Sequence, residues 1–283
     1  MHTALVASVR PARRAGRTPR PAARGGHSTA WLWRMLGLLA LLALWQLAAM
    51  AVDYRAVLPS PLEVVVDFTD SFFHDPGLAY LGVSSPGYAI NILWTVGLAA
   101  LGWAVGSLVG ATVGLLSARL QWVRNASEPL LFVFGAIPAL VLAPFCLVWF
   151  GQGPFGKFVL VAFYCFVSVG LVAQSAAASL PPAIEEYGAT QGLDARARFT
   201  HIVVPAALPA VLSGLRVALS TGIAVQATVE LLGSQFGAGR LIAIRATQGD
   251  VSAVLGLSIA IGVVAILLDV LLQRTIRIFT RWQ

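Results

Sequence analysis

Six long apolar segments constrain the fold of this chain more than any other feature. An α-helix needs about 20 apolar residues to cross the hydrocarbon core of a bilayer. Because backbone groups find no water there, a segment that crosses alone is expected to be helical. The sequence therefore predicts an all-α membrane protein with six transmembrane helices, at Trp31–Val52, Ile90–Leu116, Pro129–Phe150, Phe158–Leu180, Pro205–Leu232 and Val251–Leu272.

Composition supports this interpretation. Hydrophobic residues make up 58% of the chain and charged residues 11%, and the mean hydropathy is +0.81. Soluble domains contain about 25% charged residues. A cleaved signal peptide is the alternative for the first segment, because arginines precede it and Ala48–Ala51 is rich in small residues. Its apolar run is longer than the core of roughly 7–15 residues found in signal peptides, which favours a membrane span.

The first 30 residues differ from the rest of the chain. They contain no acidic residue and are rich in Pro, Ala and Gly. No aromatic residue alternates with their arginines, so a surface that stacks nucleic-acid bases is not indicated. The pattern predicts a disordered cytoplasmic tail over residues 1–30, followed by a transmembrane domain over 31–283. The arginines of the tail are Arg10, Arg13, Arg14, Arg17, Arg20 and Arg24.

The distribution of basic residues predicts the orientation. With the N-terminus in the cytoplasm, fourteen of the nineteen Lys and Arg residues fall in the tail and on the cytoplasmic side of the spans. Six crossings return the basic C-terminus to the same side, which agrees with the positive-inside rule. Both termini are therefore expected to be cytoplasmic, and so is the polar stretch Glu185–Thr200. The stretch 53–87 is expected to be an outer loop.

Small residues and prolines mark two of the spans. Four glycines recur every fourth residue in the second span, on one face of a helix where another helix can approach closely. They indicate a packing seam, either within this chain or with a second copy. In the third span Pro138 and Pro144 each remove a backbone hydrogen bond and are expected to bend the helix, either to line a pathway or for packing alone. The glycines are Gly102, Gly106, Gly110 and Gly114.

Charged residues within the membrane are few, and each invites a functional interpretation. Three roles are open for Arg216: facing an anion in a translocation pathway, reaching the inner headgroups, or pairing with an acid. Glu230 lies near the outer end of the fifth span and is expected to cap or line an outer gate. Asp269 is interpreted as a boundary residue.

Enzymatic and metal sites are not indicated. Histidine, cysteine and acidic residues do not cluster with metal-ligand spacing, and the two cysteines, Cys146 and Cys165, lie in apolar runs. The stretch Gly151–Lys157 fits G-x-x-x-x-G-K, but Phe158 replaces the Mg²⁺-binding hydroxyl and no strand precedes it. This stretch is interpreted as a tight turn, and neither an enzyme nor a cofactor is expected.

The longest polar interruption of the C-terminal half, Glu185–Pro209, reads as two short helices. After Pro181 and Pro182 a first helix is expected over Ala183–Gln191, with Glu185 and Glu186 in its first turn. Gly192 is suited to end it, and Asp194 to cap a second helix. Pro205 is expected to begin the fifth span.

These residues resemble the coupling loop of ABC importer permeases. Glu186, Gly192 and Pro205 stand at the spacing of that family's E-A-A…G…L-P loop, and the continuation through Pro209, Gly214 and Arg216 is also similar. Within that family, this chain most resembles the nitrate/sulfonate/taurine branch. The likeness extends to Leu58–Pro61, to Ile137–Leu140 with Trp149–Gly151, and to the glycine stripe. Tyr187 and Gly188 replace the two small alanines of the motif.

The resemblance implies a permease in the bacterial inner membrane, with a core over 88–273 and a coupling loop over 181–205. It also implies a homodimer, cytoplasmic ABC ATPase subunits that dock on the loop, and an external solute-binding protein. Glu186 would be a docking contact, Gly192 the bend and Pro205 the pivot. The branch suggests a small anionic solute such as a sulfonate, nitrate or taurine, but related permeases also carry pyrimidine-type vitamin precursors and aromatic acids, so the solute stays open. The alternatives are an ion-coupled secondary carrier, and an assembly or sensor protein that recruits a cytosolic partner.

Overall fold

A computed structural model describes residues 27–54 and 56–279, and the regular elements within them are helices. The first helix is α1 (His27–Val52), which contains the predicted span Trp31–Val52. The chain divides into two compact units, and the boundary between Trp45 and Gln46 falls within α1. Of the predicted disordered tail, 1–26 lie outside the described residues. Residues 27–30 differ from that prediction, since they are helical and begin α1.

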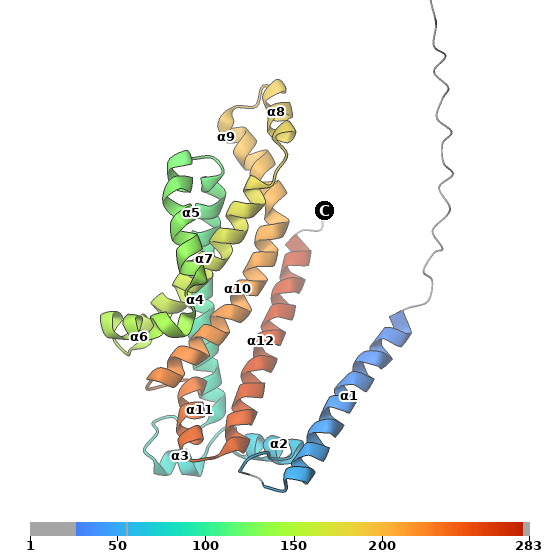
Figure 1. Cartoon of the computed structure of the whole chain (residues 1–283), viewed down its shortest axis with the longest axis vertical. Coiled ribbons are helices and arrows are strands. Elements are labelled where there is room, and N and C mark those ends of the chain that lie inside the picture. Colours follow the sequence, from blue (N-terminus) through green and yellow to red (C-terminus); the bar gives the residue numbers. More distant parts are fainter. Residues whose placement is uncertain (1–26, 55, 280–283) are drawn as a thin grey trace, which may run out of the picture. The chain divides into compact units, whose positions relative to one another are not determined.

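The second unit holds the remaining helices (Figure 1). In the figure, α8 and α9 lie at one end of the long helices, and α2, α3 and α11 lie at the other. The helices are α2 (Pro61–Asp70), α3 (Pro76–Tyr80), α4 (Tyr88–Ser117), α5 (Gln121–Ala136), α6 (Ala139–Phe150), α7 (Pro154–Ala178), α8 (Pro182–Thr190), α9 (Ala195–Arg198), the π-helix η1 (Phe199–Val203), α10 (Val204–Leu232), α11 (Ala238–Thr247) and α12 (Val251–Phe279).

The predicted all-α membrane architecture is confirmed. Five helices of the described chain are long and apolar enough to cross a membrane, and the pair α5–α6 makes a sixth if it counts as one bent span. The five are Trp31–Val52, Tyr88–Ser117, Pro154–Ala178, Ala195–Leu232 and Val251–Ile278.

The third span differs from its predicted form, a single kinked helix over Pro129–Phe150. The helix begins earlier, at Gln121, and breaks before Pro138, where α6 turns by 107° from α5. Pro138 lacks an N–H and drives Ile137 into an extended conformation. The hydroxyl of Tyr164 donates to the Ile137 carbonyl at 2.7 Å, which satisfies an acceptor that the break leaves free. Pro144, by contrast, lies inside α6 without ending it.

The glycine stripe forms the most extensive helix contact of the fold, between α4 and α7. All four stripe glycines are buried, and a Cβ built on any of them would lie within 3 Å of an α7 atom. Facing atoms include the backbone carbonyls of Ala162, Phe166 and Gly170. The stripe therefore packs against a neighbouring helix of the same chain, which distinguishes between the two partners that the sequence left open.

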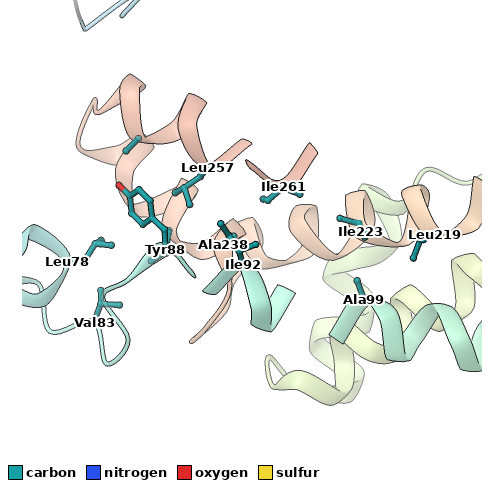
Figure 2. Packing of buried hydrophobic residues seen from close by; sticks show 12 residues of the cluster. Leu78, Val83, Tyr88, Ile92, Ala99, Leu219, Ile223, Ala238, Leu257 and Ile261 are labelled. Atoms are coloured by element: carbon teal, nitrogen blue, oxygen red, sulfur yellow. The ribbon is translucent and has the colours of Figure 1, made fainter. Parts of the chain in front are cut away.

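Two apolar clusters fill the space around this pair. One joins α4, α10, α11 and α12 with the α3 region and includes Tyr88, Ala238 and Leu257 (Figure 2). The other joins α6, α7 and α10 around Cys165 and Val169. Because α10 contributes to both clusters, its position relative to α4 and α7 is set along its whole length.

The stretch 53–87, predicted as an outer loop, contains two short helices. The Ser60 hydroxyl accepts from the backbone N–H of Glu63 at 3.3 Å, and the Glu63 carboxylate accepts from the backbone N–H of Ser60 at 2.9 Å. This capping box starts α2, which packs on α12. The S-P-x-E pattern was readable from the sequence, so α2 was a missed prediction.

The seam yields a stability prediction with a control on the same helix. Gly106→Val would place a side chain against the Ala162 backbone, and we expect it to destabilise the fold by about 1–3 kcal/mol or more. Gly97→Val meets nothing within 4 Å and should change stability by less than about 0.5 kcal/mol. Melting temperatures of the purified proteins in detergent measure both. Equal melting temperatures for the two variants would show that the seam does not hold α4 to α7.

Candidate functional site

The predicted two-helix loop is present at one end of the bundle. Gly192 follows α8 with φ +77°, a left-handed conformation that L side chains rarely adopt, and the Leu193 N–H bonds to the Gly188 carbonyl at 3.2 Å. The Asp194 carboxylate then accepts from the Ala197 N–H at 2.7 Å and starts α9. Glu185 belongs to α8, and Glu186 is exposed.

Gly188, one of the departures from the family motif, lets α8 pack closely on the following helix. A Cβ on Gly188 would lie 2.5 Å from Ile202 Cδ1 and 3.3 Å from Arg198 Cγ. Tyr187, the other departure, is 67% exposed. The substitutions therefore tighten the contact between the two short helices and place an aromatic ring on the outer surface of the loop.

The second short helix differs from its predicted form, because it is continuous with the fifth span. Arg198, Phe199, Val203 and Val204 all have right-handed helical dihedrals, and Ala195–Leu232 forms one helix of 38 residues. A π-turn precedes Pro205, where the Val204 N–H bonds to the Phe199 carbonyl. Pro205 is thus accommodated in the first turn of α10, within a helix that runs from the loop through the membrane.

A groove of about 460 Å³ lies between this loop and the ends of α4, α5 and α7. Glu186 lines it together with Arg124 and Arg198. The Arg198 Nε is buried and has no hydrogen-bond partner within the described part of the chain. The groove therefore presents charges of both signs, and a buried donor without a partner among the described residues lies in its wall.

Arg216 lies in the membrane-spanning part of α10 and pairs with Asp269 of α12. Its Nε and a terminal nitrogen donate to the two carboxylate oxygens at 2.8 and 2.6 Å. Of the three roles open for Arg216, pairing with an acid is the arrangement found. The pair is bidentate, which fixes orientation as well as distance.

Glu230 is the centre of a buried polar network at the C-terminal end of α10, opposite the two-helix loop. One carboxylate oxygen accepts from the Thr95 hydroxyl at 2.7 Å and from the Gly239 N–H at 3.0 Å, and the other accepts from the Gln226 amide at 2.7 Å. Asn91 and Thr95 also accept from the N–H groups that begin α11. Glu230 is 1% exposed, so this acid joins α4, α10 and α11.

Lys157, interpreted from the sequence only as part of a turn, is also buried near this end, in the first turn of α7. Its ammonium donates to the Gln152 carbonyl and to the Ser234 hydroxyl, both at 2.8 Å. The side chain is near the α10–α11 loop that follows Glu230, yet no carboxylate lies within 4.0 Å of it in residues 27–54 and 56–279. The Lys157 contacts join α7 to the loop.

An ion-pair cluster joins α3 to the α11–α12 turn. Arg245 pairs with Asp75 and, at 3.3 Å, with Asp250. Burial acts to raise the pKa of Asp75, but hydrogen bonds from Arg245 and from the Leu78 N–H outweigh it and hold the pKa below its ordinary value. Asp67 nearby has a raised pKa because of burial and the negative charge of Asp250.

Comparison with known proteins identifies the architecture. The family model described as binding-protein-dependent transport system inner membrane component matches residues 106–283, more than half of the chain. The chain belongs to this family. It is an ABC importer permease, and because its relatives are transport permeases the prediction that it is not an enzyme is confirmed.

Individual relatives agree with this assignment. The formylaminopyrimidine transport permease protein ThiX of Halalkalibacterium halodurans is 28% identical over 215 residues, which cover 75% of this chain and 80% of ThiX. The taurine transport system permease protein TauC of Escherichia coli is 26% identical over 175 residues, 62% of this chain and 64% of TauC. An inward-facing structure of the MetNI methionine ABC transporter shares the fold, with a TM-score of 0.59, 18% identity, and coverage of 72% and 98%.

Family membership decides between the classes of function that the sequence left open. Permeases of this kind are multi-pass inner-membrane proteins and work with an ATPase and an external binding protein as general partners. The secondary carrier and the sensor protein are therefore set aside. The positions of both termini, the dimer and the role of each site residue stay predictions.

Sequence reasoning missed most of the polar partners at the α11 end of the permease. Thr95, Asp75 and Arg245 look unremarkable along the chain because their partners are distant in sequence. Gln226 stands four residues before Glu230 on the same helix, so its partner was within reach of sequence reasoning. Lys157 did carry a signal, since it is the only lysine among 283 residues and stands in an apolar segment. Such an intramembrane cation invites a functional interpretation by itself.

The Glu230 network yields a second prediction. Glu230→Ala removes the acceptor of three buried hydrogen bonds, and we expect a loss of at least about 2 kcal/mol of stability. Glu128→Ala removes an exposed acid of the α5 pair with Arg124 and should cost less than about 0.5 kcal/mol. Denaturation of the purified variants measures the difference. A stable Glu230→Ala protein would mean that other contacts hold α11 in place.

The Asp75 pair yields a pH prediction. Because the folded state lowers the pKa of Asp75, the pair stabilises the protein above the ordinary value of about 3.9 and is lost as the pH falls through the lower, folded pKa. We expect the melting temperature of the wild-type protein to exceed that of Asp75→Asn at pH 7, and the difference to shrink toward pH 3. The opposite shift of Asp67 is present in both proteins and largely cancels. A difference that is constant with pH would contradict the prediction.

Proposed function

We propose that this permease forms the pathway for a small anionic solute and that residues 181–205, the coupling loop, receive the force of a cytoplasmic ATPase. The observation that carries the proposal is the unbroken helix from Ala195 to Leu232. A push on the loop reaches the core of the membrane domain through one rigid element. The backbone stays helical from the loop into α10, through the π-turn that precedes Pro205.

The surface of the loop suits docking of a protein partner. Ile184, Tyr187 and Leu193 are exposed apolar side chains beside the charged Glu186. A mixed surface with an exposed aromatic ring is typical of protein interfaces. The adjoining groove, lined by Glu186, Arg124 and Arg198, adds charges of both signs beside this surface.

The orientation follows from the charge distribution. The loop and the basic ends of the spans face the cytoplasm, and both termini lie on that side. The opposite end, with α2, α3 and α11, then faces outward and receives solute from the external binding protein. Two copies of the chain form the pathway between them, which is the arrangement that the family resemblance implies.

Two of the predicted pathway residues have a different role in this proposal. The guanidinium of Arg216 is held by Asp269, and the carboxylate of Glu230 is held by donors of its own chain. Both side chains therefore position α10 rather than contact solute. The break at Pro138, with α6 turned away from α5, is the part of the third span left to border the pathway.

Relatives support the solute class only broadly. The name of TauC supports taurine or another sulfonate, which matches the branch resemblance of the sequence. The name of ThiX supports a second candidate, an aminopyrimidine. Binding measurements on the external partner protein with taurine, nitrate and an aminopyrimidine separate the two classes.

The coupling role yields a prediction with a matched control. Gly192→Val strains the left-handed residue that joins the two short helices, whereas Gly192→Asn keeps that conformation accessible. In the complex reconstituted with its ATPase and binding protein, Gly192→Val and Glu186→Ala should lower solute-stimulated ATP hydrolysis at least about tenfold, equivalent to about 1.4 kcal/mol. Gly192→Asn should keep most of it. Full stimulation in all three variants would rule out the loop as the coupler.

A further inference from the structure

Lys157 lies beside a polar pocket that is separate from the groove near the coupling loop and has no role in the proposed function. A cavity of about 210 Å³ is enclosed by three segments that are distant in sequence: Trp94 of α4, the α6–α7 turn with the start of α7, and the α10–α11 loop. Lys157 is 3% exposed and lines this cavity. The remaining lining residues are Gln152, Gly153, Pro154, Ser234, Gln235 and Phe236.

The electrostatics of Lys157 are unusual for a buried cation. An ammonium group has three donors, and Lys157 uses two of them on neutral acceptors, the Gln152 carbonyl and the Ser234 hydroxyl. Within the described residues no carboxylate reaches it within 4.0 Å, and Glu230 spends both oxygens on neutral donors. The charge of Glu230 still favours the ammonium from beyond that distance. A buried charge is costly unless it is paired, so an anion in direct contact with Lys157 would add stabilisation that Glu230 does not supply by contact.

The cavity has the size and chemistry to hold that partner. The side-chain amides of Gln152 and Gln235 line the cavity and can donate hydrogen bonds, whereas the Ser234 hydroxyl already donates to the Phe236 carbonyl. The first turn of α7 has no side-chain cap, so its N-terminal dipole adds positive potential at the same place. The rings of Trp94 and Phe236, 5.4 Å apart, form an apolar wall for a short carbon tail.

We propose that this pocket binds the oxyanion head of a small solute, a sulfonate or carboxylate, with Lys157 as its counter-ion. The inference rests on the proposed transport function, and it adds a binding site at the mouth opposite the coupling loop. A purely structural role, in which Lys157 only joins α7 to the α10–α11 loop, is the outcome that would overturn it.

The only lysine of the chain allows a direct test. Full-length protein labelled with [ε-¹³C]lysine, in nanodiscs of phosphatidylcholine, should show one side-chain signal, and methanesulfonate serves as the probe. We expect a saturable change in the ¹³Cε chemical shift, with a Kd on the order of 1–10 mM, equivalent to about 3–4 kcal/mol. Neutral dimethyl sulfone, which has nearly the same shape, should produce no saturable change. A linear response to methanesulfonate, or an equal response to the sulfone, would overturn the proposal.

Two variants locate the effect while leaving Lys157 in place. Gly153 lines the pocket and has space for a Cβ, so Gly153→Leu should fill the cavity and raise the Kd at least tenfold. Gly97→Leu lies in open space on α4 and should bind like the wild-type protein. Unchanged binding by Gly153→Leu would place the anion elsewhere and overturn the assignment.

The lipid is a second source of the same chemistry, and a third arm separates it. If nanodiscs with phosphatidylglycerol already show the shifted signal and methanesulfonate adds nothing, the pocket holds a lipid headgroup and the solute assignment is wrong. Because the titration uses the permease without ATPase or binding protein, its failure leaves the coupling experiment unaffected. Loss of coupling in the reconstituted complex likewise leaves the titration unaffected.

Discussion

The close approach of the α4 and α7 backbones is the constraint on which the rest of the permease depends. In a membrane the apolar faces of helices gain little from leaving lipid, so association relies on tight packing and on polar contacts. The four glycines supply the packing by removing every side chain along one line of α4. α10 then packs on both helices, and the Trp103 indole donates to the Leu215 carbonyl at 2.9 Å. The two-helix loop lies at one end of α10 and the Glu230 network at the other.

The sequence predicted what depends on spacing along one helix. Apolar length located the spans, the four-residue period located the glycine seam, and Gly192 with Asp194 outlined the coupling loop. Sequence reasoning failed where two side chains from different helices pair with each other. Arg216 and Asp269 are 53 residues apart, and Thr95 and Glu230 are 135 apart. In a bilayer almost every face of a helix is apolar, so hydrophobic periodicity does not show which faces meet. The 107° break at Pro138 was underestimated for a related reason, since a proline indicates a bend but neighbours set its angle.

Continuity at Pro205 changes how force is expected to pass through the protein. A proline at the mouth of a span suggests a hinge between two elements. Here a π-turn comes just before Pro205, which lacks an N–H, and the chain continues as a single helix. The close approach of Gly188 to Ile202 packs the loop against that helix. Under the proposed coupling role, a displacement of the loop would pass along this helix to the other end of α10, where Glu230 bonds to α11.

The choice of cation at each position argues for different roles. Arginine at 216 and 245 is locked to carboxylates of the same chain, Asp269 and Asp75, as suits a planar fork with several donors. At 157 the chain carries its single lysine, a compact charge with neutral neighbours beside a small cavity. Arginine bonded to a carboxylate of its own chain suits a permanent contact between two helices. A site that must release its partner favours a lysine with neutral neighbours, because the lysine stays bonded within the chain when the anion leaves.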